Sequence, residues 1–179
     1  MALALKGCRY VMSCATTLAL LSYPLLMIHA GIGDIRTMQI PNNLVLLLFA
    51  GYAAAALMLP LSPVDVALSA TAAAVVFALG LVAFSFRWMG GGDVKLLTVA
   101  ALWLGAGNVV PFILYTSIFG AVLTMLILLF RAVRLPAAME ARDWILRLHQ
   151  RDAGVPYGMA IAAAGILAYS KTPWVVAQF

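Results

Sequence analysis

Charged side chains are scarce in this sequence of 179 residues, since only 9% are Asp, Glu, Lys or Arg and only six are acidic. Hydrophobic residues make up 65% of the chain, whereas in soluble domains their share is nearer half. This composition excludes an ordinary soluble globular domain. The apolar residues form continuous runs, which favours membrane-spanning helices over alternating strands.

Cysteine and histidine are also rare, with two residues of each. Cys8 and Cys14 form no C-x-x-C pair, and this argues against a zinc site. We therefore expect neither a metal nor another cofactor. The two cysteines also do not support an inference about the cellular compartment from disulfides.

The net charge of +5 raises the question of nucleic-acid binding. Most of the basic residues lie in short connections between apolar runs, where membrane topology explains them better. We expect the lipid bilayer as a partner and no binding of nucleic acid.

Six apolar runs divide the chain, at about residues 10–32, 44–59, 66–86, 94–104, 109–130 and 157–169. Because about 20 apolar residues cross a bilayer as a helix, these runs predict an all-α, polytopic membrane protein with about six transmembrane helices. We expect residues 1–179 to form a single membrane domain.

The polar segment 131–153 predicts one interfacial amphipathic helix that lies in a cytoplasmic loop. Pro136 suits its first position, and apolar side chains recur at helical spacing at Ala141, Trp144, Ile145 and Leu148. We expect this loop to contact lipid.

The charges of the connections predict the orientation of the helices. Connections 33–43, 86–95 and 131–153 fall on one side of the membrane and carry eight of the eleven Lys and Arg residues, whereas 60–64 and 105–108 carry none. The positive-inside rule places the first group in the cytoplasm, although Lys6 and Arg9 oppose this. Asp34 and Asp93 therefore share the cytoplasmic face.

Two carboxylates at one level of a helical bundle can form a catalytic pair. Because like charges a few ångströms apart do not both ionise readily, the pair shares a proton, so one member can activate a water while the other polarises a carbonyl. The alternative is that Asp34 pairs with Arg36 or another cation and Asp93 with Lys95, and each only anchors a helix end. Sequence spacing leaves both interpretations open.

Three segments together resemble the type IV prepilin peptidases, which are membrane aspartic proteases of the G-x-G-D class. Residues 90–97 (GGGDVKLL) resemble the G-x-G-D-x-K motif, and residues 34–36 (DIR) with 40–42 (IPN) resemble the first aspartate motif. Residues 155–160 (VPYGMA) resemble the Pro-aromatic-Gly turn before the last span. The order and spacing of the three matches make the resemblance specific.

The resemblance implies that Asp34 and Asp93 are catalytic, that no cofactor is needed, and that the substrate is a prepilin or pseudopilin. Its short basic leader would be cleaved just after a glycine and ahead of its apolar helix, at the cytoplasmic face of the bacterial inner membrane. The cysteine-bearing segment of larger members is missing between the first two spans, so N-methyltransferase activity is not expected. The chain looks most like the short form that serves Flp, or tight-adherence, pili.

The matching motifs also supply supporting site residues: Gly90, Gly92, Lys95, Arg36, Pro41, Asn42, Pro156, Tyr157 and Gly158. Lys95 either tunes Asp93 or snorkels to the interface, and Arg36 either binds substrate or marks the inner side. Residues 156–158 are expected to shape the rim of the site. The glycines before Asp93 are expected to let the backbone bend and a substrate approach. His29 has either a role in the site or a packing role.

Two other functions compete with peptide hydrolysis. The aspartates could relay protons in a proton-coupled transporter, although the outer halves of the spans are almost wholly apolar. The chain could also be a non-catalytic assembly subunit of a pilus or secretion machine.

Overall fold

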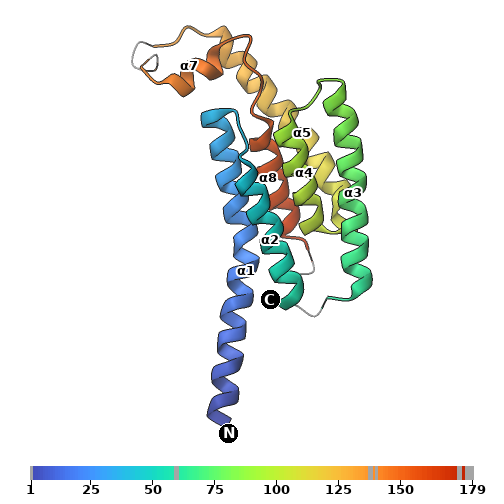
Figure 1. The fold of residues 1–179 in the computed structure, drawn as a ribbon. Coiled ribbons are helices and arrows are strands. Elements are labelled where there is room, and N and C mark those ends of the chain that lie inside the picture. The colour runs from blue at the N-terminus through green and yellow to red at the C-terminus, as the bar shows by residue number, and fades with distance from the viewer. Residues whose placement is uncertain (1, 59–60, 137–138, 140, 173–174, 176–179) are drawn as a thin grey trace.

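All regular structure is helical in the part of the chain described by the computed structural model, which covers residues 2–58, 61–136, 139, 141–172 and 175, with side chains from residue 20 onward (Figure 1). The helices are α1 (Ala2–Thr37), α2 (Asn42–Met58), α3 (Pro63–Ser85), α4 (Gly91–Leu104), α5 (Ala106–Ala132), α7 (Asp143–His149) and α8 (Tyr157–Tyr169). The predicted all-α class is confirmed.

Two helices extend further toward the aspartates than the sequence predicted. The helix α1 continues through Thr37, whose hydroxyl donates to the carbonyl of Gly33 at 2.8 Å, and Met38 then leaves the helix with φ 55°. The helix α4 begins at Gly91, with Gly90 as its N-cap. Asp34 and Asp93 therefore lie in the last turn of one helix and the first turn of another, rather than in polar loops.

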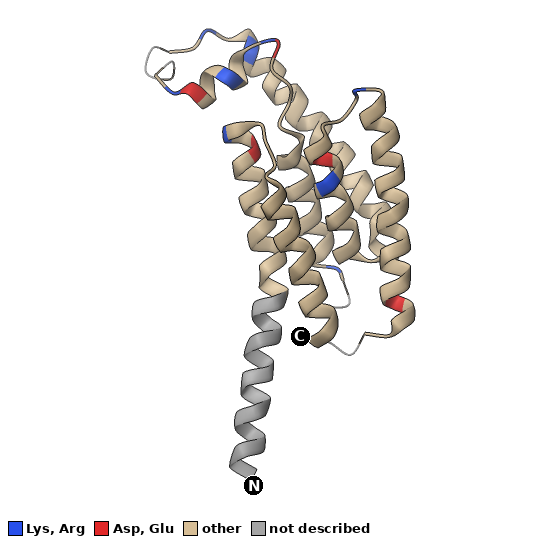
Figure 2. Ribbon diagram, viewed as in Figure 1, with Lys and Arg blue, Asp and Glu red and all other residues tan. Residues whose placement is uncertain are grey.

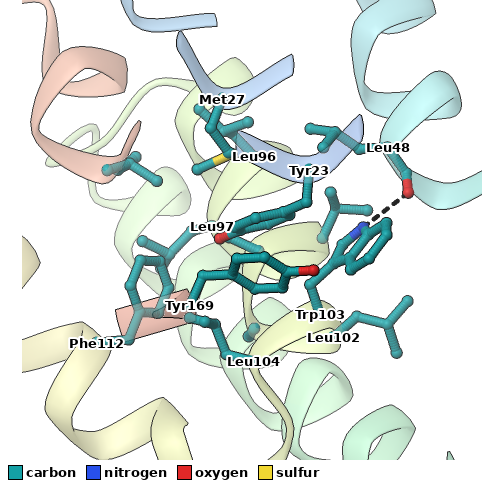
Figure 3. Close-up of a cluster of buried hydrophobic side chains, with 14 of the residues drawn as sticks. Tyr23, Met27, Leu48, Leu96, Leu97, Leu102, Trp103, Leu104, Phe112 and Tyr169 are labelled. Atoms are coloured by element: carbon teal, nitrogen blue, oxygen red, sulfur yellow. Dashed lines mark hydrogen bonds between the residues drawn. The ribbon is translucent and has the colours of Figure 1, made fainter. Parts of the chain in front are cut away.

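The short helix α4 lies at the centre of the bundle and is buried along most of its length. Figure 3 shows the core around its C-terminal half, where Trp103 packs against Tyr23 and Tyr169 with ring centroids 5.2 and 6.1 Å away. The indole N–H of Trp103 donates to the carbonyl of Leu48 at 2.9 Å, so α4 is tied to α2 as well as packed on it. This apolar core fixes where α4 presents its first turn.

The helices α3 and α5 are long and apolar enough to cross a membrane, with 23 and 27 residues and a mean hydropathy of 2.3 in each. Both expose large apolar side chains, including Leu79 on α3 and Met125 on α5. The helices α2 and α8 are apolar but shorter, with 17 and 13 residues. An integral membrane protein is consistent with these helices, while the count of six spans stays a prediction.

The amphipathic helix of the long loop is shorter than predicted. It is the seven-residue α7, whose N-cap is Arg142, so Ala141 precedes the helix in a turn. Trp144, Ile145 and Leu148 line an apolar pocket of about 360 Å³. The predicted start at Pro136 adjoins residues 137, 138 and 140, which lie outside the described part of the chain.

The three connections that contain or flank the sequence motifs lie at one end of the bundle (Figure 1). They join α1 to α2, α3 to α4 and α5 to α8, and Figure 2 shows most of the described Lys and Arg residues at this end. At the opposite end, α4 passes into α5 through Gly105 alone, whose φ of 71° allows the reversal. The tertiary structure thus gathers the charged connections as the sequence predicted.

Candidate active site

Asp34 lies at the N-terminus of α8, although it belongs to α1. Its carboxylate oxygen Oδ2 accepts the backbone N–H of Gly158 at 2.7 Å, and its side chain is only 5% exposed. The N-cap residue of α8 is Pro156, which provides no capping side chain. Asp34 therefore supplies from another helix the anionic cap that the first turn of α8 lacks.

Gly158 allows this close approach because it has no side chain. A Cβ at this position would lie 2.8 Å from Asp34 Oδ2 and 2.9 Å from Ile40 Cδ1. Both distances are shorter than van der Waals contact allows. The sequence predicted that residue 158 shapes the rim of the site, whereas in the structure Gly158 is buried and donates directly to the aspartate.

Asp93 reaches the same region from the first turn of α4. It is half-buried and lines a cavity of about 770 Å³ together with Phe84, Arg87, Trp88 and Tyr157, among other residues. Asp34 is close enough for its charge to act on Asp93. The structure thus brings the two aspartates, 59 positions apart in the sequence, into one electrostatically coupled pair.

Burial has the largest effect on the pKa values of these two aspartates, which lie outside the predicted spans 10–32 and 94–104. Burial, and to a smaller extent the negative charge of Asp34, raise the pKa of Asp93 to about 6, while the N–H of Gly90 acts in the opposite direction. Burial also raises the pKa of Asp34, and the N–H groups of Gly158 and Met159 partly offset this. Two backbone donors thus favour the ionised form of Asp34, whereas one favours that of Asp93.

The glycines before Asp93 serve packing rather than bending. Gly90 has an ordinary extended backbone, with φ −71° and ψ 146°, and Gly91 and Gly92 are already helical. A Cβ at Gly92 would lie 3.2 Å from Ile40 Cβ, and one at Gly90 would lie 3.0 Å from Asp93 Oδ2. Ile40 therefore fills the space between the first turns of α4 and α8, a role that the sequence did not reveal.

Lys95 does not contact Asp93 but donates from Nζ to Asn42 Oδ1 at 2.9 Å. Within the described residues, neither aspartate forms an ion pair with Lys or Arg, so the pairing of Asp93 with Lys95 that the anchoring alternative requires is not seen. The Lys95–Asn42 hydrogen bond instead joins α4 to the start of α2. Pro41 is exposed, and its carbonyl accepts the N–H of Leu44 at 3.1 Å where α2 begins.

The remaining predicted residues occupy different places. Pro156 is fully buried, and Tyr157 packs on Gly120 of α5 and lines the cavity beside Asp93. The side chain of Arg36 is exposed, and its backbone carbonyl accepts a hydrogen bond from Arg147 at 3.0 Å. His29 is also exposed, which does not support the packing role that was one of its two predicted alternatives.

Arg131 is a structural residue that the sequence suggested only as a topology signal. Its guanidinium donates to the backbone carbonyls of Leu148, Ala153 and Gly154 at 2.8, 2.8 and 2.9 Å. These bonds tie the segment before α8 to the end of α5. The sequence showed that Arg131 ends an apolar run. It did not show the hydrogen bonds, because the acceptors are backbone carbonyls, which every residue has.

Comparison with known proteins agrees with this arrangement. A family model described as the type IV leader peptidase family matches residues 21–125, a range that contains both aspartates. The chain belongs to the type IV leader peptidase family. This confirms the resemblance that the three motifs carried.

Within the described residues, no cluster of three or more His, Cys, Asp or Glu side chains could hold a metal ion.

A prepilin leader peptidase/N-methyltransferase of Bacillus subtilis (strain 168) is 31% identical over 144 residues. The match covers 80% of this chain but 52% of that protein, so the chain spans about half the length of this relative. No solved structure matches the sequence.

Proposed function

We propose that the chain is a membrane aspartic endopeptidase that removes the leader peptide of type IV prepilins. The observation that supports this most directly is the pair formed by Asp34 on α1 and Asp93 on α4, with Asp93 lining a cavity large enough for a peptide segment. Family membership agrees with it, as does the printed name of the Bacillus subtilis relative.

The environments of the two aspartates suggest different roles in an activated-water mechanism. Asp34, which accepts the Gly158 N–H, is the ionised member and removes a proton from water, whose oxygen adds to the carbonyl carbon of the scissile peptide bond. Asp93 donates its proton to the carbonyl oxygen. The resulting tetrahedral intermediate collapses as Asp34 passes its proton to the leaving amine, and Asp93 regains a proton from the intermediate.

The substrate proposal includes its class and its side of the membrane. We propose Flp-like prepilins or pseudopilins, cleaved at the cytoplasmic face of a bacterial inner membrane. The gathering of Lys and Arg around the aspartates supports this orientation by the positive-inside rule. Only residues 38–41 connect α1 to α2, so we propose cleavage without N-methylation.

The test is cleavage of a purified prepilin in detergent or liposomes. Asp34→Asn and Asp93→Asn should each abolish cleavage while the protein remains folded, because each removes one proton-transfer group. Asp65→Asn is the matched control, since Asp65 is exposed in the first turn of α3 at the opposite end of the bundle. Substantial cleavage by either active-site variant would refute the two-aspartate mechanism.

The same preparations distinguish the other two functions. Proton flux into liposomes without cleavage of any prepilin would favour a transporter. Correct processing of pilins in cells that carry only an aspartate variant would favour a non-catalytic assembly subunit.

A further inference from the structure

Arg87 ends α3 in a backbone conformation that favours glycine. The N–H of Trp88 bonds to the carbonyl of Ala83, and the N–H of Arg87 bonds to the carbonyl of Phe84, both at 2.9 Å. This pair of bonds is the Schellman motif of helix C-termini, whose C′ residue is usually glycine. Here that residue is Arg87, with φ 59°.

The left-handed conformation is unfavourable for arginine because its Cβ approaches the carbonyl oxygen of the same residue. Glycine would form the same turn without this strain. An arginine at such a position is therefore disfavoured by local structure, and this points to a use for its side chain.

The surroundings of Arg87 indicate what that use is. Arg87 lines the same cavity as Asp93, and these two are the charged residues among the described lining. Arg87 is exposed, and its side chain makes no hydrogen bond or ion pair with another described residue. Its guanidinium is thus available to a molecule in the cavity.

The other walls near Arg87 are apolar and suit a hydrophobic peptide. Trp88 is 78% exposed and stacks on Phe86 with ring centroids 5.1 Å apart, and Phe84 is exposed beside them. A peptide that lies in this cavity meets apolar surface, the carboxylate of Asp93 and the guanidinium of Arg87. An acidic side chain of the peptide would be repelled by the aspartates and attracted by Arg87.

We propose that Arg87 binds an acidic side chain of the peptide in this cavity and thereby selects which peptides are cleaved. This inference rests on the proposed peptidase function. Arg87 touches the substrate away from the scissile bond, so it acts on specificity through substrate binding rather than on the chemical step.

The experiment uses synthetic peptides with a basic leader and an apolar segment, each with one Asp or Glu at a successive position on either side of the scissile bond. Each peptide is paired with its Asn or Gln counterpart. We expect the unaltered protein to prefer the acidic peptide at one position by about three- to tenfold in kcat/KM, mainly through KM. Arg87→Gly should bring this ratio close to one, and Arg87→Lys should retain part of it because the charge remains.

Two controls separate this role from a structural one. Arg87→Gly should unfold at the same temperature as the unaltered protein or at a higher one, since glycine relieves the left-handed strain. Arg134→Gln removes an equal charge at an exposed position in a different connection, the long loop after α5, and should leave the ratio unchanged.

An unaltered protein that shows no preference at any position would overturn the inference, as would a preference that survives Arg87→Gly. An effect of Arg87→Gly that depends on anionic lipid and not on peptide charge would assign the residue to a lipid phosphate instead. Failure of the unaltered protein to cleave any peptide would refute the proposed function, and this inference with it.

Discussion

Asp34 is at once a side chain of the proposed site and the cap of another helix. It accepts the N–H of Gly158 at 2.7 Å in a position where an ordinary capping residue would belong to α8 itself. The hydrogen bond and the helix dipole both favour its ionised form. One contact therefore orients the carboxylate, supports its charge and positions α8 against α1.

The substitution Gly158→Ala tests whether the position of the Asp34 carboxylate matters for catalysis. Its Cβ would lie 2.8 Å from Asp34 Oδ2, so the carboxylate has to leave its present position beside the Gly158 N–H. Because displacements of about 1 Å in a reacting group can cost about a hundredfold in rate, we expect a loss of this order in kcat. The measurement is prepilin cleavage under saturating substrate.

Gly33→Ala provides the control for that experiment. It precedes Asp34 on the same helix, and a Cβ there would meet no other atom within 4 Å. We expect normal cleavage, because alanine favours a helix and has open space. Equal activity of the Gly158 and Gly33 variants would show that the close approach at Gly158 is unimportant for catalysis.

Asp93 should make stability depend on pH. Its pKa is about 6 in the folded protein, whereas the ordinary value for an aspartate is 3.8. Between pH 3.8 and pH 6, the folded chain therefore holds a proton on Asp93 that the unfolded chain has lost. Stability should therefore fall as pH rises from about 4 to about 6 and then level off. Asp93→Asn lacks this titration and should be more stable than the unaltered protein at pH 8, by on the order of 2 kcal/mol, although it cleaves nothing.

Thermal unfolding in detergent at pH 4 and pH 8 measures this difference. At pH 4 the difference between the two proteins should be small, because Asp93 is then protonated in the folded state and close to half protonated in the unfolded state. A difference between the two proteins that is the same at both pH values would contradict the assignment of the proton to Asp93.

At the scale of the elements, the site depends on how the first turn of α8 is held. Arg131, in the last turn of α5, donates to three carbonyls of the segment that leads into α8. Tyr157 packs on Gly120 of the same helix. Two parts of α5, its middle and its last turn, therefore help to position the Gly158 N–H that bonds to Asp34.

Arg131→Ala should lower cleavage and stability together. It leaves three carbonyl groups without their donor, and hydrogen bonds to charged groups contribute roughly 1.5–3 kcal/mol. Because α8 shifts relative to Asp34, we expect kcat to fall more than KM rises. The measurements are steady-state cleavage kinetics and the thermal midpoint.

Arg131→Lys and Arg134→Ala test the geometric explanation of that effect. Lysine keeps the charge but lacks the planar fork, so it should restore only a small part of the activity. Arg134 is exposed, and its replacement should have little effect. Full restoration by lysine would mean that the charge of residue 131, rather than its hydrogen bonds, matters.

At the scale of the whole molecule, most of the charged residues in the described part of the chain lie at one end of the bundle (Figure 2). The aspartates, the cavity and the long loop all belong to the charged end. The apolar outer faces of α3 and α5 favour a bilayer around the bundle. The orientation then decides which compartment supplies the substrate.

Cysteine labelling in cells tests this orientation. Gly154 and Gly107 lie toward opposite ends of the bundle, and a Cβ at either would meet no other atom within 4 Å. With Cys8 and Cys14 replaced by serine, we expect Gly107→Cys to react with a membrane-impermeant thiol reagent in intact cells. Gly154→Cys should react only after the membrane is opened, and the reverse pattern would place the site on the outer side.

Much of the fold was predictable because apolar runs in a membrane chain form helices almost regardless of their neighbours. The predicted run 157–169 coincides with α8, and the predicted runs 44–59 and 66–86 differ from α2 and α3 by a few residues. The ends of α1 and α4 were harder to predict. Residues 33–37 and 91–93 are mostly polar or glycine, yet they are helical in the structure.

By itself, the sequence determined the helical class, the family, and the placement of Asp34 and Asp93 at the same end of the bundle. These follow from hydropathy, short motifs and the charges of the loops. Only the tertiary structure decided that Gly158 donates to Asp34, that Lys95 bonds to Asn42 and not to Asp93, and that Arg87 adopts a left-handed backbone beside the cavity. The physical reason is that each feature depends on which groups, often distant in the sequence, come within a few ångströms of one another. The packing of the helices sets these distances.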